Sequence, residues 1–187
     1  MPAFAGIRVY PRSPLHMMDN LWSPWRSHYV STPNERTSEG CFLCRATIST
    51  VDPEAARGAL VVAAFEHTIV LLNRYPYNAG HLLIAPRQHV GDLTTLPSEV
   101  THELMDATQL GLRVLESELH PHGVNVGANL GASAGAGVPD HLHIHLVPRW
   151  NGDTNFMPVI GETKVVSEFI DVMCDRFILA FNALRPS

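Results

Sequence analysis

Apolar residues along the chain gather in short runs that turn-forming residues separate. The segment TIVLLN (68–73) is apolar and β-branched, and HLLIAP (81–86) is a similar run that ends at a proline. A turn-forming sequence, YPYNAG, lies between these two runs. Together with the apolar positions of 59–70, which Phe65-Glu66-His67 interrupts, they predict a hairpin and one further strand.

The longest periodic segment begins at Leu96-Pro97, where the proline suits the first turn of a helix. Apolar residues then recur at about 3.6-residue intervals, which predicts an amphipathic helix that ends at about Leu119. Its apolar stripe consists of Val100, Leu104, Ala107, Gly111 and Val114. A second helix is predicted near the C-terminus, over 165–184.

Two more strands are predicted at VNVGANL (124–130) and HLHIHLV (141–147), with the glycine-rich segment GASAGAG between them. Strands therefore occur in runs around one long helix and do not alternate strictly with helices. This order favours an α+β fold with an antiparallel sheet and two main helices.

The N-terminal segment differs from the rest of the chain. Residues 1–17 carry arginines without acids, and their prolines break the apolar core that a signal peptide needs. We interpret 1–17 as a disordered leader, with a transit peptide as the alternative. We expect 18–40 to form an arm and 41–187 to form the domain. In the arm, Trp22 and Trp25 are interpreted as packing or dimer-contact residues, with ligand platforms as the alternative.

Composition narrows the class of protein. The chain has 187 residues, 45% of them apolar, which is enough for one domain with an ordinary core. Its formal net charge is −5, and no basic stripe with interleaved aromatics occurs, so long nucleic acids are not expected partners. No apolar run reaches the roughly 18 residues of a membrane span. Three cysteines do not make a disulfide framework, so a cytoplasmic protein is expected.

The segment HLHIHLV carries the most specific chemical signal. Side chains alternate faces along a strand, so His141, His143 and His145 share one face while the aliphatic residues between them point into the core. A surface strand that merely carries histidines is one alternative. A metal site is another, because imidazole is the commonest metal ligand in proteins.

Two further segments bear on this choice. The loop from Gly131 to Gly137 consists of small residues whose backbone N–H groups can approach a phosphate closely, although glycine-rich segments are usually just turns. Beside a nucleophilic histidine, such donors suit phosphoryl or nucleotidyl transfer. Separately, Cys41-x-x-Cys44 is a metal half-site, a redox pair or a coincidence.

These motifs resemble the signature of the histidine triad family of nucleotide hydrolases and transferases. In that family His-x-His-x-His with hydrophobic spacers follows a glycine-rich loop, and LLNRYPYNAGHLLIAPRQH (71–89) is similar to its other characteristic block. The arm LWSPWR and the VPRWNGD after the triad resemble the branch that acts on diadenosine polyphosphates. The resemblance implies a five-stranded antiparallel sheet that joins its counterpart across a homodimer.

The resemblance also implies residue roles. His143 would be the nucleophile that attacks the α-phosphorus, and a neutral imidazole nitrogen near pH 7 suits that role. His145 would hydrogen-bond the phosphate or the leaving oxygen and help to protonate it. His81 would line the same pocket. Family members with the Cys-x-x-Cys pair tend to bind structural zinc, and the implied ligands here are Cys41, Cys44, His89 and His141.

The implied nucleotide contacts come from several segments. Asn73 matches the position that binds the ribose hydroxyls, and Trp150 would reach the pocket mouth. Asn129 would hold the α-phosphate, although a turn at the end of a strand explains it equally well. The backbone of Gly135, Ala136 and Gly137 would complete the phosphate site.

One departure from the family pattern affects the expected reaction. Where many relatives carry Gly-Gln-Ser or Gly-Gln-Thr, this chain has Ala136, Gly137 and Val138, which leaves space for inorganic phosphate as the acceptor. We therefore predict phosphorolysis of a dinucleoside polyphosphate through an adenylyl-His143 intermediate, with no redox cofactor. The alternatives are hydrolysis of the same or other adenylylated compounds, and a non-catalytic nucleotide-binding module that binds without turnover.

Overall fold

The computed structural model describes residues 40–153 and 168–185. Within these ranges the chain forms helices and strands in an α+β order, with two short 3₁₀ turns. The helices are α2 (Phe42–Ser49), α3 (Pro53–Gly58), α4 (Ser98–Leu119) and α6 (Ile170–Leu184), and the 3₁₀ turns are Leu93–Thr95 and Ala132–Ala134. The strands are β1 (Val61–Ala64), β2 (Thr68–Leu72), β3 (Leu82–Pro86), β4 (Gly123–Ala128) and β5 (Ile144–Arg149).

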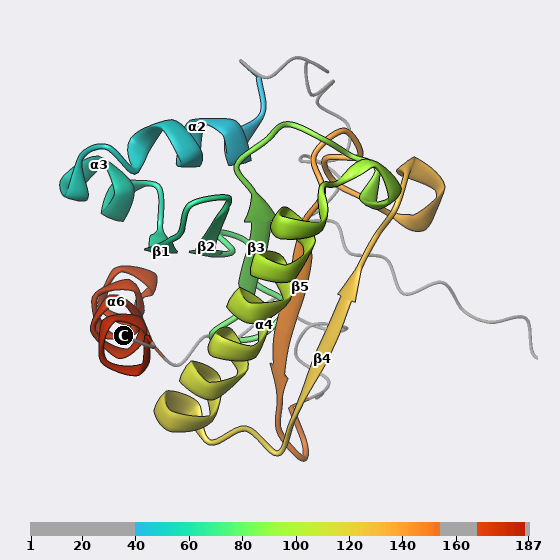
Figure 1. Cartoon of the computed structure of the whole chain (residues 1–187). Coiled ribbons are helices and arrows are strands. Elements are labelled where there is room, and N and C mark those ends of the chain that lie inside the picture. Colours follow the sequence, from blue (N-terminus) through green and yellow to red (C-terminus); the bar gives the residue numbers. More distant parts are fainter. Residues whose placement is uncertain (1–39, 154–167, 186–187) are drawn as a thin grey trace, which may run out of the picture.

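The five strands form one antiparallel sheet in the order β1-β2-β3-β5-β4, which confirms the predicted sheet (Figure 1). β1 and β2 form the predicted hairpin around 65–67. The long connection through α4 carries the chain to β4 at the opposite edge, and β5 then inserts between β4 and β3. This insertion places the histidine segment in the middle of the sheet.

Helices cover both faces of the central strands. Val70 and Leu72 pack with α4 and α6 in the larger core, whereas Ile69 and Leu71 pack on the other face with Leu43 of α2. Every residue of β2 and β3 is buried as a result, and this is why both strands read as continuous apolar runs. Figure 1 shows α4 lying along the sheet with α6 beside it.

Several element boundaries differ from those predicted. β5 begins at Ile144, three residues after His141, because Leu142 N–H donates to the carbonyl of Val90 at 2.7 Å before the strand ladder starts. α6 begins at Ile170, and 154–167 lie outside the described residues. α4 matches the predicted helix closely.

The short helices α2 and α3 were not predicted from the pattern. The N-terminus of α3 nevertheless has typical helix-start residues. Asp52 accepts a hydrogen bond from Ala55 N–H at 2.9 Å, and Pro53 occupies the first turn. The predicted leader 1–17 and all of the arm 18–40 except Gly40 lie outside the described residues. Among the helices of 40–153 and 168–185, none has the length and apolar character needed to cross a bilayer.

Candidate active site and metal centre

A cavity of about 330 Å³ lies between α2, the β2–β3 loop and the segment that leads into β5. It brings together side chains that are up to a hundred residues apart in sequence. The walls are formed by Phe42 and Arg45 of α2, Asn73, Arg74, Tyr75 and Tyr77 of the β2–β3 loop, and Asn129, Gly135, Gly137, His143 and His145 from the glycine-rich loop and the triad.

His143 is buried at the cavity wall, with 6% of its surface exposed. Its Nδ1 atom lies 2.9 Å from the main-chain carbonyl oxygen of His141. A carbonyl oxygen only accepts, so Nδ1 carries the proton and Nε2 keeps a free lone pair. Burial lowers the pKa of His143, and the bond to the carbonyl opposes this only in part. The imidazole is therefore neutral and nucleophilic at neutral pH.

His145 is oriented by a second buried histidine. Tyr77 N–H donates to His81 Nδ1 at 3.2 Å, so the proton of neutral His81 sits on Nε2. That Nε2 lies 2.9 Å from His145 Nδ1 and donates to it. His145 therefore carries its own proton on Nε2, which makes it a hydrogen-bond donor beside His143. The ring of Tyr77 stacks on His81 with centroids 4.9 Å apart and fixes this arrangement.

A glycine makes this loop conformation possible. Gly80 directly precedes His81 and has a φ of +77°, which disfavours any residue with a Cβ. A Cβ at this position would also lie 2.3 Å from Leu119 Cδ1 of α4. The chain can therefore reverse against α4 and place His81 directly before β3.

Four side chains of the types that ligate metals, one of them the first triad histidine, lie close together. The ligand atoms of Cys41, Cys44, His89 and His141 all lie within 4.8 Å of one another. His141 Nδ1 is 3.3 Å from Cys41 Sγ, 3.5 Å from Cys44 Sγ and 3.3 Å from His89 Nδ1. Ligands at zinc distances of about 2.0–2.3 Å in a tetrahedron are separated by roughly 3.3–3.8 Å. The donor set and its spacing fit zinc.

The protonation of His141 also suits a metal ligand. Its Nε2 lies 2.8 Å from the carbonyl oxygen of Pro86 and donates to it, which leaves the Nδ1 lone pair aimed at the cysteines. Burial lowers the pKa of His141 to about 4. Burial and the neighbouring Cys41 raise the pKa of the Cys44 thiol to about 11, and a bound cation is the partner that would favour its thiolate.

Close backbone packing brings His89 next to His141. A Cβ on Gly91 would lie 2.4 Å from the carbonyl oxygen of Pro139, so only glycine permits this approach. The bond from Leu142 N–H to the Val90 carbonyl then ties the two segments together. The metal-ligand cluster thus depends on a contact that joins residues about fifty positions apart.

The glycine-rich loop borders the same cavity. Gly131 and Gly135 have φ values of +82° and +84°, so the loop turns tightly at both ends of its 3₁₀ turn. Asn129 Nδ2 lies 3.5 Å from the carbonyl oxygen of Gly135. The exposed loop backbone thereby lies along the same cavity as His143 and His145.

Some of the residues predicted from the sequence line the cavity, and others do not. Asn73, Asn129, Gly135 and Gly137 belong to its described walls, as do His143 and His145. His81, Ala136 and Trp150 are not among these described wall residues, and His81 acts on the site through His145.

Several wall residues were not predicted as part of the site. Phe42 and Arg45 come from α2, and Arg74 and Tyr77 from the β2–β3 loop. Arg45 and Arg74 make the described wall cationic, because none of its described residues is a carboxylate. Arg45 follows Cys44 and Arg74 follows Asn73 in the sequence, which was a usable signal. The direction in which these two side chains point depends on the tertiary fold.

Comparison with known proteins gives consistent matches. The profile of the HIT domain matches residues 55–152. The AP-4-A phosphorylase of Mycobacterium tuberculosis is 39% identical over 154 residues, which cover 82% of this chain and 79% of that protein. A Zn-bound histidine triad family protein from Mycobacterium smegmatis has a TM-score of 0.61 at 28% identity, covering 79% of this chain and 97% of that one. A hypothetical histidine triad nucleotide-binding protein from Sulfolobus tokodaii shares the fold, with a TM-score of 0.61 at 23% identity over 78% of this chain and 94% of that one.

Proposed function

Because the chain belongs to the histidine triad family, we propose that it is a nucleotidyl transferase that cleaves dinucleoside polyphosphates by phosphorolysis. The observation that carries this proposal is the free Nε2 lone pair of His143 at the wall of a cavity with cationic residues. The likeness to the mycobacterial AP-4-A phosphorylase supports diadenosine tetraphosphate as the substrate.

In the first step His143 Nε2 attacks the α-phosphorus of the bound dinucleotide. A P–N bond forms as the P–O bond to the rest of the polyphosphate breaks, which leaves an adenylyl group on His143. His145 holds a proton on Nε2, through its contact with His81, and donates it to the departing oxygen. ATP is the leaving group when the substrate is diadenosine tetraphosphate.

In the second step inorganic phosphate attacks the same phosphorus. A phosphate oxygen forms the new P–O bond and gives its proton to His145 Nε2, which restores that donor. The P–N bond breaks, and the lone pair returns to His143 Nε2. The product is ADP. The small side chains of Ala136 and Gly137 support phosphate as the acceptor, because they leave room near the site where relatives carry a glutamine.

The nucleoside would be held by the α2 side of the cavity. Asn73 would bind ribose hydroxyls, and Phe42 and Tyr75, which also line the cavity, would offer aromatic surfaces for a base. The guanidinium groups of Arg45 and Arg74 suit either base stacking or phosphate contacts. Asn129 and the backbone of Gly135 to Gly137 would bind the α-phosphate.

Zinc would have a structural role in this protein. The four ligands Cys41, Cys44, His89 and His141 form a closed donor set with no open position for substrate. When bound, zinc supplies a rigid anchor for the chain before β5. His141 would then be held by metal and His143 left free to react.

We also propose a homodimer that joins two sheets through β4. Among the described strands, β4 pairs only with β5, so its other edge is open. Val126 on this strand is 51% exposed, and its neighbours Asn125 and Gly127 are exposed too. An apolar open edge of this kind is a ready site for strand addition.

The test is to incubate the purified protein with diadenosine tetraphosphate, with and without inorganic phosphate, and to separate the nucleotides by chromatography. ADP and ATP that appear only with phosphate are the expected result. AMP and ATP without phosphate would make the protein a hydrolase. Binding without turnover of this or other adenylylated compounds would make it a nucleotide-binding module.

A further inference from the structure

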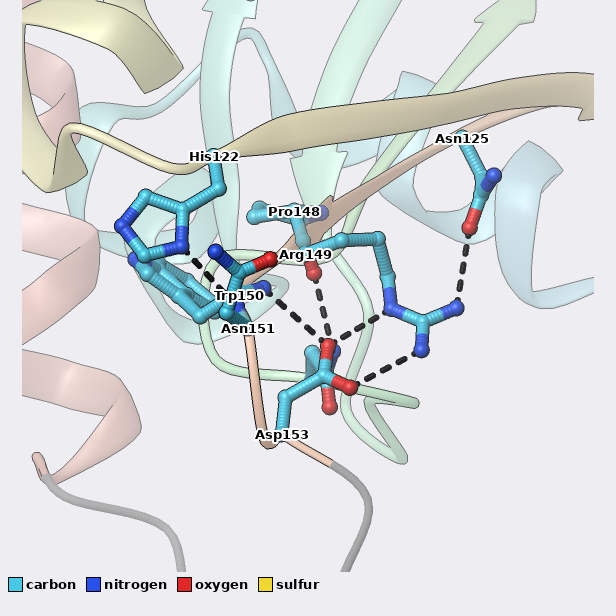
Figure 2. Close-up of polar contacts among 8 residues, drawn as sticks. His122, Asn125, Pro148, Arg149, Trp150, Asn151 and Asp153 are labelled. Atoms are coloured by element: carbon cyan, nitrogen blue, oxygen red, sulfur yellow. Dashed lines mark hydrogen bonds and ion pairs between the residues drawn. The ribbon is translucent and has the colours of Figure 1, made fainter.

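An ion pair at the end of β5 lies next to the site without lining its cavity. Arg149 Nε and Nη2 donate to the two carboxylate oxygens of Asp153, at 2.6 and 2.9 Å. Figure 2 shows the two side chains facing each other, with the third arm of the guanidinium directed to Asn125 of β4. That contact, from Nη1 to the Asn125 amide oxygen, is 3.0 Å long.

Asp153 also holds the loop that carries the site. Its Oδ2 accepts from Asn78 Nδ2 at 2.8 Å, and the same amide donates to the carbonyl of Pro148 at 2.9 Å. Trp150 N–H adds a fourth donor to this carboxylate at 3.2 Å. Although Arg149 is 45% exposed, the Asp153 side chain is only 12% exposed, so the carboxylate is largely shielded by the groups it binds.

A short chain of contacts leads from Asn78 to the triad. The carbonyl oxygen of Asn78 accepts from His81 N–H at 3.2 Å, and His81 Nε2 donates to His145 Nδ1. Tyr77, the residue before Asn78, donates its N–H to His81 Nδ1. Any displacement of Asn78 therefore moves both groups that set the protonation and orientation of His81.

We propose that the Arg149–Asp153 pair is a positioning clamp that fixes the 73–81 loop, and through it the His81–His145 contact, for proton transfer to the leaving group. Neither residue touches substrate in this account. The catalytic consequence rests on the proposed function, whereas the fixing of the loop does not.

The molecule contains a matched control for this clamp. Arg57 of α3 also donates through two nitrogens to both oxygens of an aspartate, Asp175 of α6. Both pairs are bidentate, and both arginines are about equally exposed, at 45% and 44%, whereas Asp175 is more exposed than Asp153. Among the described residues, Arg57 and Asp175 form no hydrogen bond with 73–81, so Asp175→Asn removes a similar interaction away from Asn78 and His81. Arg74 of the loop donates to the carbonyl of Gly58 in α3, so the comparison applies to 75–81.

The kinetic test compares Asp153→Asn with Asp175→Asn on diadenosine tetraphosphate. We expect Asp153→Asn to lower kcat about 10-fold, since a misplaced general acid loses its alignment with the leaving oxygen. The loss should shrink for an adenylyl ester whose leaving group has a low pKa and needs no proton. Asp175→Asn should keep the kinetics of the unchanged protein on both substrates. Equal kinetics for the two variants, or a loss independent of the leaving group, would overturn the clamp.

A second readout does not depend on activity. Hydrogen–deuterium exchange followed by mass spectrometry should show faster exchange of 75–81 in Asp153→Asn and unchanged exchange in Asp175→Asn. Unchanged exchange of this loop in Asp153→Asn would refute the clamp even if the enzyme works as proposed. Conversely, an unmodified protein that turns over no nucleotide would refute the proposed function, while the exchange comparison would still decide the clamp.

Discussion

His143 donates from Nδ1 to the main-chain carbonyl of His141, 2.9 Å away, and the side chain of His141 belongs to the metal-ligand cluster. One residue thus presents its imidazole to the metal site and its carbonyl to the nucleophile. Holding the His141 imidazole in the cluster therefore also helps to hold the carbonyl that keeps the proton on His143 Nδ1. His143 Nε2 is then the nitrogen that is free to react.

His145 should matter most when the leaving group needs a proton. We expect His145→Ala to lower kcat for diadenosine tetraphosphate by about 10²–10⁴-fold, the usual contribution of a general acid. His81→Ala should lower kcat less, because His81 acts only by orienting His145. Steady-state kinetics on both variants test this. A larger loss in His81→Ala than in His145→Ala would contradict the assignment.

Metal analysis tests the Cys₂His₂ cluster. Purified protein should contain about one zinc ion per chain by elemental mass spectrometry, and Cys44→Ser should lose most of it. A ligand at about 100 times its Kd stabilises a protein by about 2.7 kcal/mol, so chelation should lower Tm by roughly 5–10 °C. Cys174→Ser, a change at a buried core cysteine outside the cluster, should keep its zinc. Full zinc content in Cys44→Ser would exclude the proposed site.

The open edge of β4 predicts a dimer in solution. Light scattering after size-exclusion chromatography should give twice the chain mass, and Val126→Lys should shift the protein toward monomer by placing a charge on the edge strand. Met105→Lys, on an exposed position of α4, should leave the mass unchanged. A dimer that survives Val126→Lys unchanged would locate the interface elsewhere.

The Arg57–Asp175 pair should make stability depend on acid pH. The hydrogen bond from Arg57 lowers the pKa of the Asp175 carboxyl below its usual 3.8. A folded-state pKa below the unfolded value means that the pair stabilises the fold above about pH 4 and that this contribution is lost as pH falls through the folded pKa. Asp175→Asn should therefore lower Tm by at most a few degrees at pH 7, and the difference should narrow below pH 4. A difference that stays constant down to pH 3 would contradict this.

Sequence patterns predicted the elements whose helical or strand conformation is indicated by their own residues. β2, β3 and α4 have long apolar runs or a sustained helical period, and the structure confirms each. α2 buries only Leu43 and Ala46, so its eight residues carry too short a pattern to identify. Its helical state depends on packing against β2 and β3.

The histidine segment shows a different limit of sequence reasoning. Alternation correctly placed Leu142 and Leu146 in the core, but it predicted a strand three residues too early. The hydrogen bond from Leu142 N–H to the Val90 carbonyl, which precedes the ladder, joins positions far apart in sequence. Such a contact leaves no local trace in the pattern.

Residue types identified the reactive residues and the candidate metal ligands of the site better than they identified the residues that line its cavity. Imidazoles and thiols are uncommon enough that His143 and the Cys-x-x-Cys pair stood out, and the structure brings Cys41 and His141 together across a hundred residues. Arg45 and Phe42 were missed because arginine and phenylalanine are common and their direction depends on the tertiary fold.

The most direct test of the account is to trap the nucleotide on His143. Protein mixed with radiolabelled diadenosine tetraphosphate in the absence of phosphate would be quenched under neutral denaturing conditions, and its peptides mapped by mass spectrometry. We predict an adenylyl group on the peptide that contains His143, its disappearance with release of ADP when phosphate is added, and no adduct in His143→Ala. Turnover without an adduct, an adduct on another residue, or an active His143→Ala variant would contradict the account.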